Sequence, residues 1–258
     1  MRNPCVAHRG WSGAAPENTL AAVRLAAEAD DVEWAEIDVQ LSSDGIPVLM
    51  HDKRLNRTTN GGRAEAARVA AAKLQSLDAG SWFSPAFSQE GVPLLEEVLR
   101  ETGDRLKFNI ELKRHDRVDG LLEERVAEAV ERSGMRERSV LTSFSRESLR
   151  HLRSLDTGIK TGLISDSWSA SLPAELSGLG CSLLSADHSA MNRERIRLLK
   201  AAGIRTMVWT LNDFRLIRRY ALMDPSVLIC TNYPDRWREA LRSLPQPLEL
   251  PGRDAWPG

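Results

Sequence analysis

Side chains able to transfer protons or bind cations are concentrated in the first fifth of the chain, at the ends of short apolar segments. His8 and His51 are two of them, and Glu36 and Asp38 lie between them. A further carboxylate, Glu111, ends a later apolar segment. Histidine titrates near neutral pH and suits proton transfer to ester oxygens, whereas carboxylate oxygens are the ligands that Mg²⁺ and Ca²⁺ prefer. The pattern indicates metal-assisted chemistry on an anionic substrate, with phosphate as the first candidate.

Other side chains beside these groups could hold such a substrate. Arg9 and Lys113 carry positive charges that would bind non-bridging phosphoryl oxygens. Trp209 ends another apolar segment and either walls the substrate pocket or packs in the core. Asn232, after a later segment, either makes a polar contact or caps the helix that follows.

Short apolar segments alternate with longer helical patterns along most of the chain. We expect eight strands, over Pro4–Ala7, Trp34–Asp38, Leu106–Leu112, Ser139–Ser143, Ile159–Ile164, Ser182–Ala186, Ile204–Thr210 and Val227–Thr231. Helices are expected over Thr19–Ala29, Leu94–Thr102, Val118–Ser133, Arg146–Ser154, Arg193–Ala202, Phe214–Ala221 and Asp235–Leu244. Alternating strands and helices form parallel sheets, and eight such units predict a closed (β/α)8 barrel, the TIM barrel of the α/β class.

The functional groups of a (β/α)8 barrel lie at the C-terminal ends of its strands, which is where the candidate residues fall. Glu36 and Asp38 are two positions apart in one strand, so their side chains share a face. Glu111 would reach the same end from the neighbouring strand. Three carboxylates that converge in a dry site cannot all be ionised without a cation. We therefore expect one divalent cation, Mg²⁺ or Ca²⁺, held by oxygen ligands.

One connection is predicted to be a hairpin instead of a helix. The dipeptide Asp44-Gly45 lies between apolar flanks and indicates a two-residue turn. With that turn at its centre, the hairpin would place Asp38 opposite His51. We therefore expect His51 to return to the level of the carboxylates.

A long segment, about residues 52–93, then interrupts the alternation and is poor in strands. Its alanine-rich part, Ala64–Leu74, is expected to be helical, and Trp82, Phe83 and Phe87 belong to an irregular aromatic stretch. We expect this insertion to pack over the barrel mouth within a single domain of residues 1–244. Residues 245–258, rich in proline and glycine, are expected to form an extended or mobile tail.

Length and composition exclude several classes of protein. The 258 residues suit one large α/β domain, and a net charge of −1 gives no basic surplus for nucleic acid or an acidic membrane. Cys5, Cys181 and Cys230 form no CxxC pair, which indicates buried free thiols. No segment approaches the roughly 20 apolar residues of a membrane span, and the early first strand leaves no room for a signal peptide. We expect a cytoplasmic protein with a small-molecule substrate, and its oligomeric state stays open.

Taken together and in order, the motifs resemble those of the glycerophosphodiester phosphodiesterase family, over nearly the whole chain. The middle of the chain looks like the cytosolic bacterial branch of that family, the UgpQ type. The motifs are His8-Arg9-Gly10, Pro16-Glu17-Asn18-Thr19, Glu36-x-Asp38, His51-Asp52, Glu111-x-Lys113, Asp78–Phe83, Pro93–Val98, Trp209-Thr210-x-Asn212 and Cys230–Pro234.

The resemblance implies a barrel with an insertion, a divalent cation, and hydrolysis of glycerophosphodiesters to sn-glycerol 3-phosphate and an alcohol. Matched motif by motif, it implies that Glu36, Asp38 and Glu111 are the metal ligands and that His8 and His51 are the acid–base pair. It also implies that Arg9 and Lys113 bind phosphate, and that Glu17 and Asp52 support the histidines and the loop. Asn232 departs from the Asp that is common in the family. That departure puts polar contacts at the rim in doubt and leaves the metal ligands intact.

Two routes and two other functions stay open from the sequence. The glycerol 2-hydroxyl could attack phosphorus to give a cyclic glycerophosphate that water then opens, or water could attack directly. A related barrel could cleave lysolipids as a lysophospholipase D, using the aromatic side chains of the insertion as an apolar channel. A catalytically inactive barrel could bind glycerophosphodiesters without cleaving them, although the intact motif set argues against this.

Overall fold

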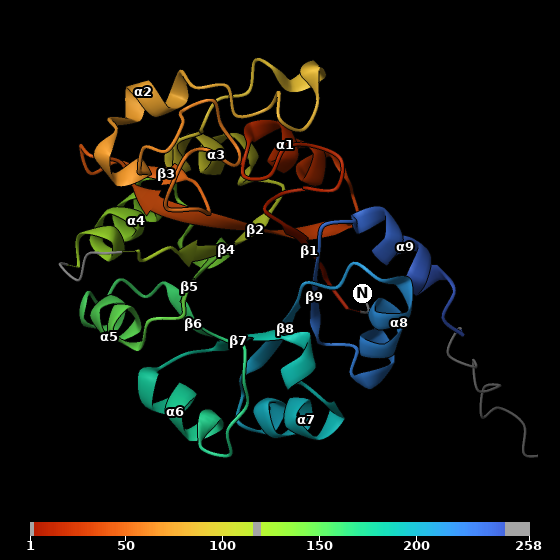
Figure 1. Ribbon diagram of the computed structural model, residues 1–258. Helices are drawn as coiled ribbons and strands as arrows, with labels where there is room; N and C mark the ends of the chain where they lie inside the picture. The colour runs from red at the N-terminus through yellow and green to blue at the C-terminus, as the bar shows by residue number, and fades with distance from the viewer. Residues whose placement is uncertain (1–2, 116–119, 246–258) are drawn as a thin grey trace, which may run out of the picture.

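Eight parallel strands close into a barrel in the computed structural model, which describes residues 3–115 and 120–245 (Figure 1). The ring runs β1-β9-β8-β7-β6-β5-β4-β2 and closes by pairing between β1 and β2, while β3 pairs antiparallel with β2. The strands are β1 (Cys5–His8), β2 (Val32–Leu41), β3 (Pro47–Leu49), β4 (Lys107–Leu112), β5 (Ser139–Ser143), β6 (Lys160–Ser165), β7 (Leu183–Asp187), β8 (Arg205–Trp209) and β9 (Leu228–Thr231). The predicted (β/α)8 barrel is confirmed.

Helices surround this ring on its outside (Figure 1). The α-helices are α1 (Leu20–Glu28), α2 (Ala71–Gln75), α3 (Leu95–Thr102), α4 (Leu121–Arg132), α5 (Arg146–Ser154), α6 (Leu172–Leu179), α7 (Arg193–Ala201), α8 (Phe214–Met223) and α9 (Pro234–Arg242). Short 3-10 helices are η1 (Ala66–Arg68), η2 (Pro85–Phe87), η3 (Arg136–Arg138) and η4 (His188–Ala190). The helix expected from Val118 is α4, and Val118 itself lies outside the described residues.

Helix α6, between β6 and β7, was not predicted from the sequence. It has only eight residues, and Pro173 occupies its first turn, where proline is tolerated because the first N–H groups have no partner within the helix. Ser171 precedes it without making a side-chain cap. A short helix without a cap and with a proline has a weak sequence signal, so its stability comes from packing Leu172, Leu176 and Leu179 against the barrel.

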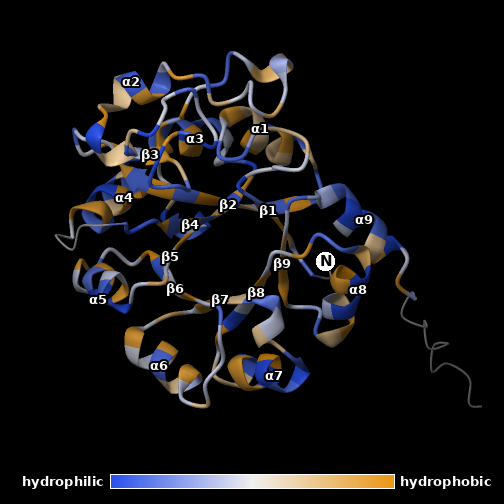
Figure 2. Cartoon of the chain, viewed as in Figure 1, coloured by the Kyte–Doolittle hydropathy of each residue, from blue (hydrophilic) through white to orange (hydrophobic). Residues whose placement is uncertain are grey.

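Apolar side chains fill both sides of the ring. The main cluster lies between the strands and the helices, and a smaller cluster inside the ring includes Val6, Trp34, Val140 and Met207. Figure 2 shows apolar and polar residues interspersed along the surrounding helices, as expected for helices with one buried face. The three cysteines are free and buried, as predicted. Of the helices in the described part of the chain, none combines the length and the apolar character needed to cross a membrane.

The hairpin exists, but its predicted register is wrong by one residue. The observed pairs are Val39 with Leu49 and Leu41 with Pro47, so the backbone oxygen of Asp38 accepts a hydrogen bond from Met50 and not from His51 (3.0 Å). The reason is a three-residue loop, 43–45, in place of the two-residue turn. Gly45, its last residue, has φ +75°, the left-handed conformation that such loops require. His51 follows directly and still reaches the carboxyl end of the barrel.

The insertion, residues 52–93, lies at the β2 side of the ring, beside α1 and α3, and leaves the centre of the ring uncovered in Figure 1. It has its own apolar cluster, formed with β3 by side chains that include Val48, Leu55 and Leu74. The single helix expected over Ala64–Leu74 is wrong. Two short helices, η1 and α2, are separated there by extended backbone at Val69 and Ala70.

Candidate active site

The three predicted carboxylates meet at the carboxyl end of two neighbouring strands. Glu36 and Asp38 lie on β2 and Glu111 on β4, and the parallel register pairs Asp38 directly with Glu111. One carboxylate oxygen of each residue lies within 4.8 Å of the others. Glu36 and Asp38 are only 4% and 1% exposed. Three acidic groups thus lie together in a buried site, where water hydrates their negative charges poorly.

Electrostatics at this acidic cluster favour a bound cation. Burial, together with the charges of Asp38 and Glu111, raises the pKa of Glu36 well above its usual value. Burial and Asp38 raise the pKa of Glu111 to about 7. Burial also acts to raise the pKa of Asp38, but Lys113 and Arg9 outweigh it and lower that pKa to about 2. The donors are all oxygens, so Glu36, Asp38 and Glu111 fit a hard divalent cation.

Asp38 is fixed by neighbours on three sides. Asn18 donates to its carboxylate from Nδ2 at 2.8 Å and accepts from its backbone N–H at 3.1 Å. Arg9 Nε lies 3.1 Å and Lys113 Nζ lies 3.3 Å from its two oxygens. Lys113 also donates to Glu111 at 2.7 Å. Asn18 had no predicted role in the site. Its two hydrogen bonds to Asp38 show that it orients this carboxylate.

His8 ends β1 at the rim of the acidic cluster. Its Nδ1 donates to Asn232 Oδ1 at 2.6 Å, and its Nε2 lies 3.8 Å from a Glu36 oxygen. Asn232 is held in turn, because its backbone N–H donates to Asn212 Oδ1 at 2.9 Å. Burial and the nearby charge of Arg9 lower the pKa of His8 to about 4. Of the two roles considered for Asn232, the polar contact is the one observed.

His51 reaches the same mouth from the start of the insertion. Its Nδ1 donates to Asp52 Oδ1 at 2.7 Å. Arg57 donates to the second oxygen of Asp52 at 2.6 Å and to both oxygens of Glu17, at 2.7 and 2.9 Å. Arg9 donates to Glu17 at 2.7 Å, so a chain of charge-assisted hydrogen bonds runs from His51 back to the loop after β1.

This chain shifts the titration of its members. Arg57 and the His51 imidazole lower the pKa of Asp52, although burial opposes this. The pKa of His51 is lowered mainly by burial, while Asp38 acts to raise it. Glu17 and Asp52 both belong to this chain of hydrogen bonds, and their supporting role stays a prediction. Arg57, which joins them, was missed because an exposed arginine within a loop carries no sequence signal of its own.

A cavity of about 170 Å³ opens between these groups. Its lining includes His8, Arg9, Glu36, His51, Glu111, Lys113, Phe144 and Trp209. Trp209 and Phe144 pack edge to face with ring centres 6.3 Å apart. Trp209 therefore forms part of the pocket wall, opposite the charged groups.

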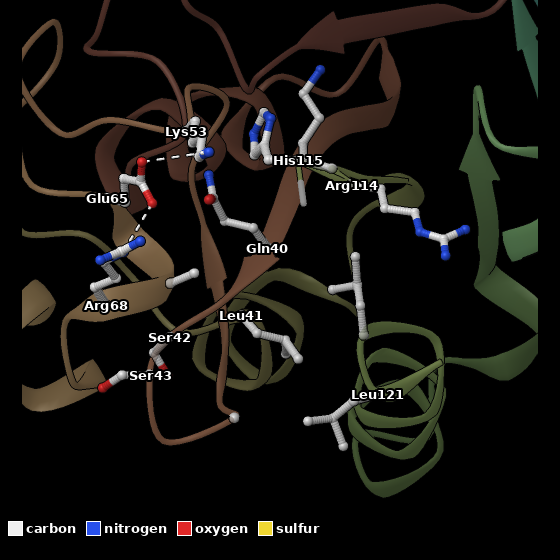
Figure 3. A pocket seen from close by; sticks show the side chains of 14 residues that line it. Gln40, Leu41, Ser42, Ser43, Lys53, Glu65, Arg68, Arg114, His115 and Leu121 are labelled. Atoms are coloured by element: carbon white, nitrogen blue, oxygen red, sulfur yellow. Dashed lines mark hydrogen bonds and ion pairs between the residues drawn. The ribbon is translucent and has the colours of Figure 1, made fainter. Parts of the chain in front are cut away.

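A second and larger cavity, of about 370 Å³, adjoins the first and shares Lys113 with it. It lies between the hairpin, η1 and the start of α4. Figure 3 shows Glu65 between Lys53 and Arg68 on one side, at 3.4 and 3.1 Å, and Leu121 on the other. This cavity could not be predicted from the sequence, because its wall combines residues from three distant segments.

Comparison with known proteins places the chain among phosphodiesterases. A family model described as the glycerophosphoryl diester phosphodiesterase family matches residues 8–236. The Bacillus subtilis (strain 168) protein YhdW is 34% identical over 233 residues, which span 89% of this chain and 94% of that protein. A glycerophosphodiester phosphodiesterase of the same organism is 33% identical over 248 residues, 89% of this chain and 83% of that protein.

Solved structures agree with these relatives. An Oleispira antarctica phosphodiesterase in complex with the product sn-glycerol-3-phosphate superposes with a TM-score of 0.87 and 31% identity, covering 94% of this chain and 98% of that one. A glycerophosphodiester phosphodiesterase from Agrobacterium tumefaciens str. C58 gives a TM-score of 0.80 and 29% identity, covering 92% and 99%. The chain belongs to the glycerophosphoryl diester phosphodiesterase family, and the predicted enzyme class is confirmed.

Proposed function

We propose that the protein hydrolyses glycerophosphodiesters to sn-glycerol 3-phosphate and an alcohol, with a divalent cation and two histidines. The observation that carries the proposal is the set of side chains around the cavity of about 170 Å³, which we call the reaction pocket. His8 and His51 line it and each has Nδ1 bound to a neighbour. Two of the three carboxylates and two cationic side chains line it as well. The product named for the Oleispira antarctica structure supports the choice of substrate.

The cation would be Mg²⁺ or Ca²⁺, held by Glu36, Asp38 and Glu111. When bound there, a divalent cation would polarise a phosphoryl oxygen and lower the pKa of a hydroxyl beside it. Arg9 and Lys113 would bind the remaining non-bridging oxygens, since both are held at the mouth by carboxylates. These side chains fix the phosphate before any bond changes, which is how positioning lowers the barrier.

The partners of the two histidines suggest different roles. His8 donates a hydrogen bond from Nδ1–H to the amide oxygen of Asn232, which leaves Nε2 as the proton acceptor. His51 is paired with the carboxylate of Asp52, which stabilises an imidazolium able to protonate the departing alcohol. We propose that His8 takes the proton of the attacking hydroxyl, either the glycerol 2-hydroxyl or water. In the cyclic route the two roles reverse when water opens the ring.

Replacement of each histidine tests this assignment. His8→Ala and His51→Ala should each lower kcat by roughly 10²–10⁴-fold. His188→Ala is the matched control, because His188 also follows a barrel strand but is absent from the lining of the reaction pocket. Near-normal turnover in either of the first two variants removes that histidine from the mechanism.

A 2-deoxy substrate analogue separates the two routes. Loss of turnover supports attack by the glycerol hydroxyl, and unchanged turnover supports direct attack by water. The lysolipid alternative is less favoured by the geometry, because Trp82, Phe83 and Phe87 are absent from the lining of both cavities.

A further inference from the structure

A third cavity lies toward the opposite end of the barrel from the reaction pocket, and Asn109 and Met207 line both. Its volume is about 250 Å³, several times the roughly 30 Å³ that one water occupies in the liquid. Lys107, Ser139, Lys160 and Arg205 line it, and each is the first residue of its strand: β4, β5, β6 and β8. Because all eight barrel strands are parallel, this is the amino end of the barrel, whereas the acidic cluster is at the carboxyl end.

Three cationic side chains and one carboxylate, that of Glu137, line this amino-end cavity. Lys107 lies 3.6 Å from Glu33, and Lys160 lies 4.0 Å from Glu137, so both are weakly paired near the surface. For Arg205 no carboxylate within residues 3–115 and 120–245 lies at ion-pair distance. Its guanidinium lies over the Trp34 ring, 5.6 Å from the ring centre, and Lys107 Nζ lies 5.7 Å from the same centre.

Two buried polar side chains in the cavity wall also lack a partner. Trp34 Nε1 and Ser139 Oγ make no hydrogen bond to any residue in the described part of the chain. Trp34 is 6% and Ser139 1% exposed. A buried donor without a partner destabilises the fold. The indole N–H can only donate, so its partner must offer an acceptor.

We propose that the amino-end cavity binds a phosphate oxyanion. The indole, two ammonium groups and the guanidinium can only donate hydrogen bonds, so they match a ligand rich in acceptors and negative charge. Inorganic phosphate and a small phosphate monoester such as glycerol 3-phosphate share this chemistry. Neither needs the reaction pocket, so the site would work independently of the proposed hydrolysis.

Tryptophan indole resonances give a direct test. Protein labelled with ¹⁵N at tryptophan is titrated with inorganic phosphate, and separately with glycerol 3-phosphate, in chelator at constant ionic strength. Trp34 reports on the amino-end cavity and Trp209 on the reaction pocket, with the two peaks assigned by Trp34→Phe and Trp209→Phe. We expect the Trp34 peak to move saturably, and the ligand with the lower midpoint identifies the source of the phosphate.

Two variants assign the effect to this cavity. Arg205→Met should raise the Trp34 midpoint at least tenfold while turnover stays unchanged. Arg197→Met removes the same charge from an exposed position of α7 and should change nothing. Lys113→Met, which alters the reaction pocket, should leave the Trp34 titration as it is in the unaltered protein.

Two results would overturn the proposal. One is a Trp34 peak that stays in place with both ligands while the protein remains folded. The other is the same Trp34 midpoint in Arg205→Met as in the unaltered protein. Both are independent of whether the enzyme cleaves glycerophosphodiesters, because turnover is measured separately.

Discussion

Asn232→Ala tests whether the amide that holds His8 contributes to turnover. The change removes the acceptor that lies 2.6 Å from His8 Nδ1. A buried donor left without a partner costs about 1–3 kcal/mol. If that cost falls on the transition state, kcat/KM should drop about 5- to 150-fold, since 1.36 kcal/mol corresponds to a factor of ten. Steady-state release of glycerol 3-phosphate measures it.

Asn232→Asp separates orientation from general disruption. The carboxylate keeps the acceptor and adds a negative charge, which should raise the pKa of His8 from about 4. As pH falls, His8 would then become protonated at Nε2 at a higher pH than in the unaltered protein. The acid limb of the pH–rate profile should therefore move to higher pH. A residue that only supports the fold would not shift this limb. Turnover at high pH should recover relative to Asn232→Ala.

Asn192→Ala provides the matched control. Asn192 caps α7 by accepting from the Arg195 N–H at 2.9 Å, and its replacement removes the same atoms at a residue that lines neither the reaction pocket nor the larger cavity beside it. Loss of this helix cap should lower the stability of the fold by about 0.5–2 kcal/mol and leave turnover unchanged. The reasoning is refuted if Asn232→Ala keeps turnover within twofold of the unaltered protein, or if both alanine variants lose activity equally.

Three further predictions concern charge and space around the mouth. The pKa of Glu111 is raised from 4.5 to about 7 in the folded protein, so the unfolded chain loses this proton at a lower pH than the folded protein does. The stability that the proton contributes is full below the unfolded pKa of 4.5 and is lost as pH rises through the folded pKa of about 7. The Tm in chelator should therefore fall between pH 6 and 8, and saturating Mg²⁺ should remove the fall; a flat Tm in chelator argues against it. Arg57→Met breaks the bridge between Asp52 and Glu17 and should lower kcat about tenfold, which corresponds to 1.36 kcal/mol and lies just below the roughly 1.5–3 kcal/mol of a charged hydrogen bond. Steady-state kinetics measure this, and an unchanged kcat and KM would show that turnover does not need the bridge. Because the larger cavity adjoins the reaction pocket at Lys113, we propose that it holds the alcohol of the substrate. Leu41→Trp should then fill it and slow hydrolysis of glycerophosphoinositol more than that of glycerophosphoethanolamine; equal slowing excludes this cavity as the place of the alcohol.

The sequence predicted the barrel and the acidic cluster because both depend on local patterns. Glu36 and Asp38 had to share a face, since side chains alternate along a strand. Their meeting with Glu111 followed once β2 and β4 were neighbours in a parallel sheet. The positions of His8 and His51 followed from strand ends.

Features that depend on exact geometry or on distant contacts were not predictable. The hairpin register depended on whether its loop has two residues or three, and the Asp-Gly signal fits both. Arg57 became recognisable only when folding brought it to Asp52, and the polar contact considered for Asn232 could be assigned to His8 only in the fold. The larger cavity beside the reaction pocket and the amino-end cavity have walls from several segments, so no single stretch of sequence predicts them.

The most direct test of the proposed function is the release of sn-glycerol 3-phosphate from glycerophosphocholine with Mg²⁺, with Ca²⁺ and with chelator. Glu111→Gln is compared in parallel, because it removes one proposed ligand charge with little change in shape. The account predicts cation-dependent release that chelator abolishes and that Glu111→Gln lowers strongly. Release that continues unchanged in chelator, or no release with either cation, would contradict it.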